Sequence, residues 1–189
     1  MRATILVAED DVITRWDLRE ILEGHGYRVL EAGDGEEAVT LARRLRPDLI
    51  LLDIKMPRQD GLEVAERLFR EEIPIVFLTA YSQASLIQRA AALMAHGFLV
   101  KPAPEGEILA QVELALKNAH RLRTLTRELD RTQRTLAERK EVERAKDLLA
   151  KKLGIPPDEA YKRLRDQSMA EGKPIGQIAR GILDKWGSS

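Results

Sequence analysis

Leu49-Ile50-Leu51-Leu52-Asp53-Ile54-Lys55-Met56-Pro57 is the stretch of sequence on which the predicted fold depends. Four apolar residues in a row are typical of a strand that is buried on both faces, as in a parallel sheet covered by helices. The run ends on the carboxylate of Asp53, and in open α/β sheets ligands bind at the carboxyl ends of the strands. The stretch therefore predicts a site at the end of a central strand.

A second group of carboxylates follows another apolar run, since Ile5-Leu6-Val7-Ala8 leads directly into Glu9-Asp10-Asp11. Two adjacent parallel strands would bring this group and Asp53 to the same edge of a sheet. Carboxylates that crowd together repel one another and are tolerated mainly when a cation neutralises them, and oxygen ligands favour Mg²⁺. The pattern predicts a small acidic Mg²⁺ site around Asp53, formed with this second group of carboxylates.

The first two thirds of the chain alternate apolar runs with amphipathic stretches. The runs recur every 21 to 26 residues, and the predicted strands are Thr4–Ala8, Arg28–Ala32, Leu49–Asp53, Ile75–Thr79 and Gly97–Val100. The stretches between them have helical periodicity, and the predicted helices are Val12–Leu22, Gly35–Leu45, Leu62–Glu71 and Ser82–Ala95. This βα alternation predicts the α/β class, with a five-stranded doubly wound parallel sheet and helices on both faces.

Two further polar residues fall at predicted strand ends, where this architecture places chemistry. Thr79 closes the fourth strand, and Lys101 follows the fifth. A hydroxyl and an ammonium that converge on a carboxylate and a cation suit a phosphoryl group, with the carboxylate as nucleophile. Each residue alone is more often structural, but their joint placement favours a site that forms an aspartyl phosphate.

These residues carry a resemblance to a known family. Residues 3–118 resemble the receiver domain of two-component response regulators, a flavodoxin-like fold. The matching pieces are Ile5–Asp10, Leu51–Pro57 with Asp60-Gly61, Leu78-Thr79-Ala80 and Phe98–Pro102. The resemblance implies that Asp53 is the phosphoacceptor for a sensor histidine kinase, and that the chain is not an enzyme beyond assisting its own phosphorylation and dephosphorylation. The implied metal ligands are Glu9 (through water), Asp10, Asp53 and the backbone carbonyl of Lys55, and the implied switch and phosphoryl-binding residues are Thr79, Lys101 and Phe98.

The composition indicates in which compartment the protein is found. Hydrophobic residues make up 44% of the chain and charged residues 33%, and no apolar run approaches the roughly 20 residues of a membrane helix. The chain contains no cysteine, which excludes disulfides and thiolate metal sites. The first 25 residues carry acids and bases throughout, unlike a signal peptide. We expect a soluble, cytoplasmic protein that does not contact a membrane.

The charge is divided unevenly along the chain. Residues 1–118 hold 14 Lys and Arg against 20 Asp and Glu, a net charge of −6, whereas residues 119–189 hold 17 against 11, a net charge of +6. This division indicates two modules, the second of which could face a polyanion. The plainer alternative is that solvated helices carry these arginines without such a partner.

A long helix is predicted after the receiver-like part. No Gly or Pro occurs from Glu107 to Leu153, a run of 47 residues. Within it, residues at coiled-coil spacing form a narrow stripe, and the phase breaks before Val142, so the helix either bends there or changes partner. We expect residues 119–141 to be a helical linker that pairs with a second copy in a homodimer on activation; packing against its own domain is the alternative. The stripe comprises Leu122, Leu125, Leu129, Thr132 and Leu136.

The end of the chain predicts a small all-α domain. A stop and restart at Leu153-Gly154-Ile155-Pro156-Pro157 precedes a helix over Asp158–Met169, and a last amphipathic helix ends near Trp186. Residues 124–186, which overlap the linker, resemble the ANTAR domain of antitermination regulators. The matching pieces are Val142–Lys146 with Leu149, Leu153–Ile155, Asp158–Tyr161 with Leu164-Arg165, and Ile178-Ala179 with Ile182-Leu183.

The ANTAR resemblance implies a dimer that binds paired RNA hairpins. Cations suit phosphate contacts, and Tyr161 could stack on a splayed base, or could instead be a half-buried core residue. The candidate RNA-binding residues are Arg144, Lys146, Lys151, Tyr161, Lys162 and Arg165.

Three functions remain open at this stage. The first is a phosphorylation-controlled RNA-binding antiterminator. The second is a response regulator that binds DNA or acts through a protein partner, although the last helix offers few readers of a DNA groove. The third is an enzyme that forms an aspartyl phosphate, which the lysine at position 55 disfavours because such an enzyme needs a second acid there.

Overall fold

The computed structural model describes residues 3–57, 59–80 and 96–186. The chain forms two compact units, residues 1–123 and 124–189, and each is described by itself below. The predicted helix over Ser82–Ala95 lies outside the described residues.

The first unit is built on the predicted five-stranded parallel sheet, with the order β2-β1-β3-β4-β5. Strands β3 and β4 are buried at every residue, as the continuous apolar runs predicted. The strands are β1 (Thr4–Ala8), β2 (Arg28–Ala32), β3 (Leu49–Asp53), β4 (Ile75–Thr79) and β5 (Gly97–Val100), which agree with the predicted bounds.

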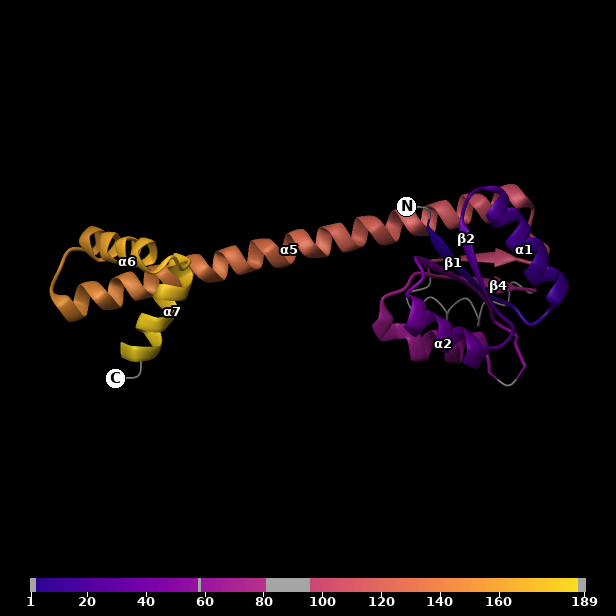
Figure 1. Ribbon diagram of the computed structural model, residues 1–189, viewed down its shortest axis with the longest axis horizontal. Coiled ribbons are helices and arrows are strands. Elements are labelled where there is room, and N and C mark those ends of the chain that lie inside the picture. Colours follow the sequence, from indigo (N-terminus) through magenta and orange to yellow (C-terminus); the bar gives the residue numbers. More distant parts are fainter. Residues whose placement is uncertain (1–2, 58, 81–95, 187–189) are drawn as a thin grey trace. The chain divides into compact units, whose positions relative to one another are not determined.

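Helices cover both faces of this sheet (Figure 1). On one face, α2 (Gly35–Leu45) and α3 (Gly61–Leu68) pack on one apolar cluster, and a 3₁₀ turn, η1 (Phe69–Glu71), follows α3. On the other face, α1 (Val12–Gly24) and the first turns of α5 (Glu105–Leu153) pack on a second cluster. The predicted helix over Leu62–Glu71 is thus shorter, because its last residues tighten into the 3₁₀ turn.

The register of the strands places the chemistry-bearing residues at one edge. Ala8 of β1 pairs with Leu52 of β3, so Glu9 lies level with Asp53. Asp53 pairs in turn with Leu78, and Thr79 pairs with Val100, which puts Lys101 one residue beyond the fifth strand. Each of these residues therefore ends or follows a strand at the carboxyl edge of the sheet.

The second unit is a three-helix domain, as predicted. The end of α5 packs against α6 (Pro157–Glu171) and α7 (Ile175–Trp186). Its core consists of small and aliphatic side chains from all three helices, namely Val142, Ala145, Leu149, Ala160, Leu164, Ile178 and Ala179. The apolar face of α5 thus changes partner after the phase break that the sequence showed.

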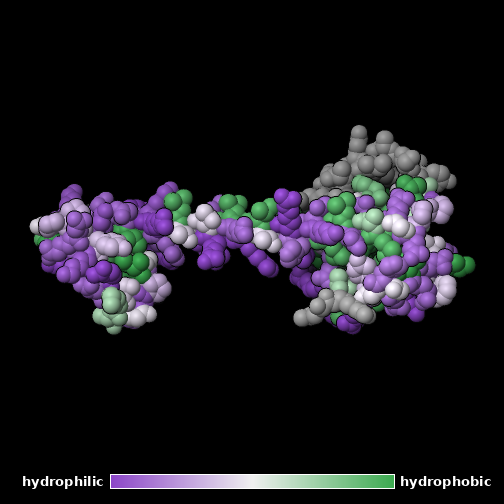
Figure 2. All heavy atoms as spheres, turned by 90° about the horizontal axis from the view of Figure 1, so that it is seen from above, coloured by the Kyte–Doolittle hydropathy of each residue, from purple (hydrophilic) through white to green (hydrophobic). Residues whose placement is uncertain are grey.

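The linker part of α5 is continuous with the rest of the helix and is exposed. Every side chain from Arg121 to Lys140 is exposed, and at the start of this stretch Arg123 donates a hydrogen bond to the carbonyl of Glu72 at 3.1 Å. Apolar residues recur along it among hydrophilic ones (Figure 2). The four stripe leucines Leu122, Leu125, Leu129 and Leu136 are each more than half exposed. Within the described part of the chain, no helix is both long and apolar enough to cross a membrane.

Candidate functional site

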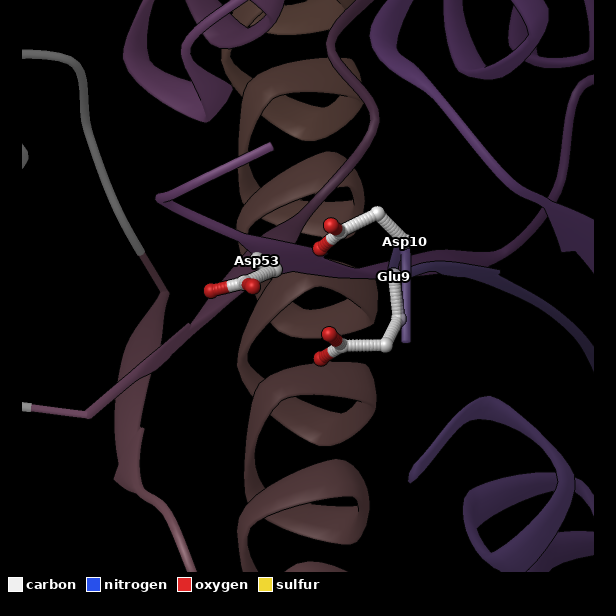
Figure 3. A group of neighbouring side chains, drawn as sticks. All are labelled: Glu9, Asp10 and Asp53. Atoms are coloured by element: carbon white, nitrogen blue, oxygen red, sulfur yellow. The ribbon is translucent and has the colours of Figure 1, made fainter. Parts of the chain in front are cut away.

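Three carboxylates converge at the carboxyl edge of the sheet. Glu9 and Asp10 follow β1, and Asp53 ends β3. Carboxylate oxygens of the three lie within 4.8 Å of one another, and their side chains point toward a common space (Figure 3). Glu9 and Asp53 are 1% and 4% exposed, which leaves little water to screen their repulsion.

Lys101 supplies the positive charge that the structure places among these acids. Its Nζ donates a hydrogen bond to Glu9 Oε2 at 2.8 Å and another to Asp53 Oδ2 at 2.9 Å. The backbone fixes the lysine at this place, because its amide donates to the carbonyl of Thr79 at 2.8 Å. One ammonium therefore bridges the ends of β1 and β3 from the end of β5.

Burial and neighbouring charges shift the pKa values of Glu9 and Lys101 in this cluster. Burial raises the pKa of Glu9, as does the charge of Asp53, against the hydrogen bond from Lys101, which lowers it. Burial alone would lower the pKa of Lys101, but its hydrogen bonds to Glu9 and Asp53 raise that pKa overall. The ammonium therefore stays charged, while the Glu9 carboxyl takes up a proton more readily than an ordinary glutamate.

The donor set fits a divalent cation. Three carboxylates against one ammonium leave a net negative charge at a buried edge, and hard oxygen ligands are those that Mg²⁺ prefers. Glu9, Asp10 and Asp53 are the residues that could hold such an ion.

We expect the affinity for Mg²⁺ to decrease as the solution is acidified, and we expect this decrease to begin at a pH above 4.5, the ordinary pKa of a glutamate side chain. The reason is that the cation binds the deprotonated carboxylate, and the pKa of Glu9 is raised, so a proton competes earlier. Calorimetric titration of the full-length protein with Mg²⁺ at a series of acidic pH values measures this. Glu9→Gln should bind more weakly and lose part of the pH dependence, whereas an affinity that stays flat down to the ordinary glutamate value would contradict the prediction.

The other predicted receiver residues lie around this cluster. Thr79 ends β4 and is buried. The backbone amide of Lys55 donates a hydrogen bond to Asp53 Oδ1 at 3.3 Å, and the Lys55 side chain is exposed. Phe98 lies in β5 and stacks on Phe77, with ring centroids 5.9 Å apart. The sheet therefore brings Thr79 and Lys101 to the acidic edge, and Phe98 packs on the sheet instead.

The candidate RNA-binding residues all lie in the second unit, on α5 and α6. Tyr161 is 42% exposed and stands outside the apolar core, so it is not the core residue of the alternative interpretation. Lys146 is mostly covered and paired with Glu143, which makes it less available than its neighbours. The other five candidates are exposed on these helices, namely Arg144, Lys151, Tyr161, Lys162 and Arg165.

Two residues that support the site were not singled out from the sequence as functional. Gly61 opens α3, and a Cβ there would lie 2.1 Å from the carbonyl oxygen of Asp53. Arg15 of α1 donates hydrogen bonds to the carbonyls of Glu9 and Asp10. The only sequence signals were the Asp60-Gly61 pair after Asp53, and a cation one turn into the helix that follows the first acids.

Comparison with known families divides the chain into the same two parts. Residues 5–113 match the response regulator receiver domain, and residues 130–183 match the ANTAR domain. The chain therefore belongs to the response regulators that join a receiver to an ANTAR domain, a family of signalling proteins and not of enzymes. The resemblances read from the sequence are confirmed.

Individual relatives agree with this assignment. The transcriptional regulatory protein PdtaR of Mycobacterium tuberculosis is 39% identical over 186 residues, which cover 97% of this chain and 91% of that protein. The DNA-binding response regulator MtrA of the same species is 36% identical over 118 residues, 62% of this chain and 52% of that protein. The solved structure of the chemotaxis protein CheY4 of Vibrio cholerae superposes with a TM-score of 0.59 at 29% identity, covering 61% of this chain and 99% of CheY4.

Proposed function

We propose that a sensor histidine kinase phosphorylates Asp53 and that this modification controls RNA-hairpin binding and transcription antitermination by the C-terminal domain. The observation that carries the proposal is the bridge from Lys101 to Glu9 and Asp53, at the carboxyl edge of a receiver sheet in a chain that also has an ANTAR domain. The proposed division is a receiver over 3–118, a helical linker over 119–141 and an RNA-binding domain over 124–186.

The chemistry at the receiver follows from its own residues. A carboxylate oxygen of Asp53 attacks the phosphorus atom of the kinase phosphohistidine, so that an O–P bond forms and the P–N bond breaks, and the released imidazole takes up a proton. Lys101 and Thr79 donate to the phosphoryl oxygens, and Phe98 repacks when Thr79 moves. Asp10, Asp53, the carbonyl of Lys55 and, through water, Glu9 would hold Mg²⁺, which would offset the negative charge that gathers at phosphorus.

The C-terminal domain provides the RNA contacts in this proposal. Arg144 and Lys151 are seven residues apart on α5 and share a face, as do Tyr161 and Arg165, four apart on α6. These exposed cations suit phosphate groups, Tyr161 suits stacking on an unpaired base, and Lys146 and Lys162 complete the set. Loops of hairpins are the expected target, since A-form grooves hide base edges from side chains.

Binding of the full-length protein to a pool of RNA hairpins and to duplex DNA, at one salt concentration, tests the proposed function. We expect hairpins to bind more tightly than DNA, and more tightly still when beryllofluoride mimics the phosphoryl group on Asp53. Arg165→Ala should weaken hairpin binding about 10-fold, the effect of one lost phosphate or base contact. The matched control is Arg163→Ala, which removes the same charge from the same helix, but whose guanidinium is held by Glu159 at 2.8 Å. Preference for duplex DNA would favour a DNA-binding regulator instead, and no binding in either state would favour a protein partner.

We further propose that the leucine stripe of the linker pairs two copies of the chain in an activated homodimer. Leucines that are more than half exposed at coiled-coil spacing lose this exposure when two helices pair. Each buried leucine contributes roughly 1.5–3 kcal/mol.

Leu129→Glu should therefore raise the dissociation constant of the dimer about 100-fold, since both copies lose one such contact. Sedimentation velocity with and without beryllofluoride measures this. Thr124→Glu, which introduces the same charge about a third of a turn away from the stripe, is the control and should leave the dimer intact. Equal dimer affinity in Leu129→Glu and the unmodified protein would contradict a dimer through this stripe.

A further inference from the structure

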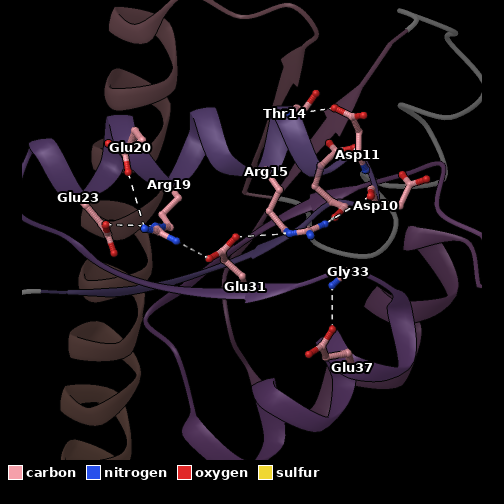
Figure 4. Close-up of polar contacts among 11 residues, drawn as sticks. Asp10, Asp11, Thr14, Arg15, Arg19, Glu20, Glu23, Glu31, Gly33 and Glu37 are labelled. Carbon is pink, nitrogen blue, oxygen red and sulfur yellow. Dashed lines mark hydrogen bonds and ion pairs between the residues drawn. The ribbon is translucent and has the colours of Figure 1, made fainter.

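Arg15 joins the first turn of α1 to the backbone that carries two of the acids. Its side chain is 17% exposed, and Nη1 donates hydrogen bonds to the carbonyl oxygens of Glu9 at 2.5 Å and Asp10 at 3.4 Å. Figure 4 shows the guanidinium of Arg15 between Asp10 and Glu31. Nη1 carries two N–H donors, so it can serve two neighbouring carbonyls, while Nε of the same rigid guanidinium faces another acceptor.

These carbonyls belong to the segment where the sheet ends. The ladder of β1 closes at Ala8, and the amide of Glu9 still donates to the carbonyl of Ala32 at 3.1 Å. Beyond that bond the backbone leaves the sheet, and the carbonyls of Glu9 and Asp10 accept from Arg15. The carboxylates of Glu9 and Asp10 and that of Asp53 repel one another, and the hydrogen bonds from Arg15 restrain the backbone of Glu9 and Asp10 against this repulsion, in addition to the bridge from Lys101.

The guanidinium is itself fixed from a second strand. Arg15 Nε lies 3.5 Å from Glu31 Oε1, and Glu31 is part of β2. Arg19, one turn later on α1, also reaches Glu31, at 3.2 Å, and pairs with Glu23. Arg15 and Arg19 thus share an acidic partner, but the contacts to the Glu9 and Asp10 carbonyls belong to Arg15.

We propose that Arg15 is a positioning residue for the metal site: it fixes the backbone of Glu9 and Asp10 so that their carboxylates are preorganised for the cation. This inference rests on the proposed function, in which the acidic cluster holds Mg²⁺. Partners of this kind, which act through the ligands, typically change metal affinity 10- to 100-fold when removed.

The sign of the effect separates positioning from simple electrostatics. Arg15 carries a positive charge near the cation site, so its removal should strengthen Mg²⁺ binding if only charge mattered. If Arg15 instead holds the ligands in place, its removal should weaken binding.

The test is calorimetric titration of the full-length protein with Mg²⁺. We expect Arg15→Ala to bind Mg²⁺ about 10-fold more weakly than the unmodified protein. Arg15→Lys can reach a carbonyl but lacks the planar guanidinium, so its Mg²⁺ affinity should lie between those of Arg15→Ala and the unmodified protein. Arg19→Ala is the matched control, because it removes the same charge from the same helix and a contact to the same acid, Glu31. Its Mg²⁺ affinity should stay within about 2-fold of the unmodified protein. At saturating Mg²⁺, the rate of phosphorylation by acetyl phosphate should recover in Arg15→Ala.

A second readout needs no metal. Amide hydrogen exchange of Asp10 and Asp11, followed by NMR, should be faster in Arg15→Ala than in Arg19→Ala, while the strand amides of β3 stay equally protected in both. That last comparison also verifies that the variants are folded. If Arg15→Ala does not fold, the same two measurements are made on Arg15→Lys and Arg19→Ala. Weaker Mg²⁺ binding and faster exchange in Arg15→Lys than in Arg19→Ala would then support the inference.

Unchanged or tighter Mg²⁺ binding in Arg15→Ala would overturn the inference, as would equal losses in Arg15→Ala and Arg19→Ala. Failure of the proposed function gives a different result, since the unmodified protein itself would then neither bind Mg²⁺ nor accept a phosphoryl group.

Discussion

Asp53→Asn is expected to reduce phosphoryl incorporation from acetyl phosphate to background, a loss on the order of 10³-fold or more, as for removal of a catalytic nucleophile. The amide keeps the size of the side chain and an oxygen that can accept from the amide of Lys55, but it has no carboxylate to attack phosphorus. Intact-mass spectrometry of the full-length protein, with Mg²⁺ present, measures the incorporation directly.

A neighbouring acid provides the control for this substitution. Asp11 caps α1 by accepting from the amide of Thr14 at 2.8 Å, and this hydrogen bond lowers the pKa of its carboxyl. Asparagine is an equally good cap, so Asp11→Asn makes the same chemical change and should preserve phosphorylation. Incorporation that survives in Asp53→Asn would place the phosphoacceptor elsewhere.

Gly61→Ala is expected to destabilise the receiver by about 3 kcal/mol and to slow phosphorylation together with it. A methyl group at this position would overlap the carbonyl oxygen of Asp53, which is backbone and cannot rotate away. The Gly61 amide also donates to the carbonyl of Ile54 at 2.8 Å, so α3 cannot withdraw without losing that bond. The backbone of the phosphoacceptor must therefore move, which displaces its carboxylate from the position in which Lys101 now contacts it.

Urea unfolding, together with the rate of acetyl phosphate labelling, measures both effects. Gly106→Ala serves as the control, because a Cβ there meets nothing within 4 Å, and alanine in the first turns of α5 favours the helix. A Gly61→Ala protein as stable as Gly106→Ala would show that α3 can shift without cost.

Much of the receiver could be predicted from sequence because its strands are buried on both faces. Their apolar runs are unbroken, and polar residues stand out where each run ends, as at Asp53 and Thr79. Parallel order then brings these ends together without knowledge of the exact register. The helix that follows Asp60-Gly61 was less well predicted, since periodicity alone does not distinguish the last α-helical turn from the 3₁₀ turn over Phe69–Glu71.

Contacts between side chains and the backbone of other segments could not be predicted from the sequence. The path of Arg15 to two carbonyls depends on how α1 leaves the sheet, and the fit of Gly61 depends on the approach of α3 to Asp53. In the C-terminal domain, composition marked cations but not their availability, and the pairing of Lys146 with Glu143 became visible only in the folded helix. Exposure of Tyr161 was likewise undecided, because an aromatic at helical spacing suits a core equally well.

The exposed stretch of α5 should unfold locally, independently of the two packed units. From Arg121 to Lys140 the helix has no buried side chain, so in a single chain it is held mainly by its own backbone hydrogen bonds. Most of the stability of a helix in a protein comes from packing of its apolar face, so an unpacked segment opens at a free energy far below that of a packed core. Its many arginines then become substrates for trypsin. A second copy that covers the leucines would stabilise the segment by mass action, so in the activated homodimer the protease resistance of this stretch should rise with protein concentration.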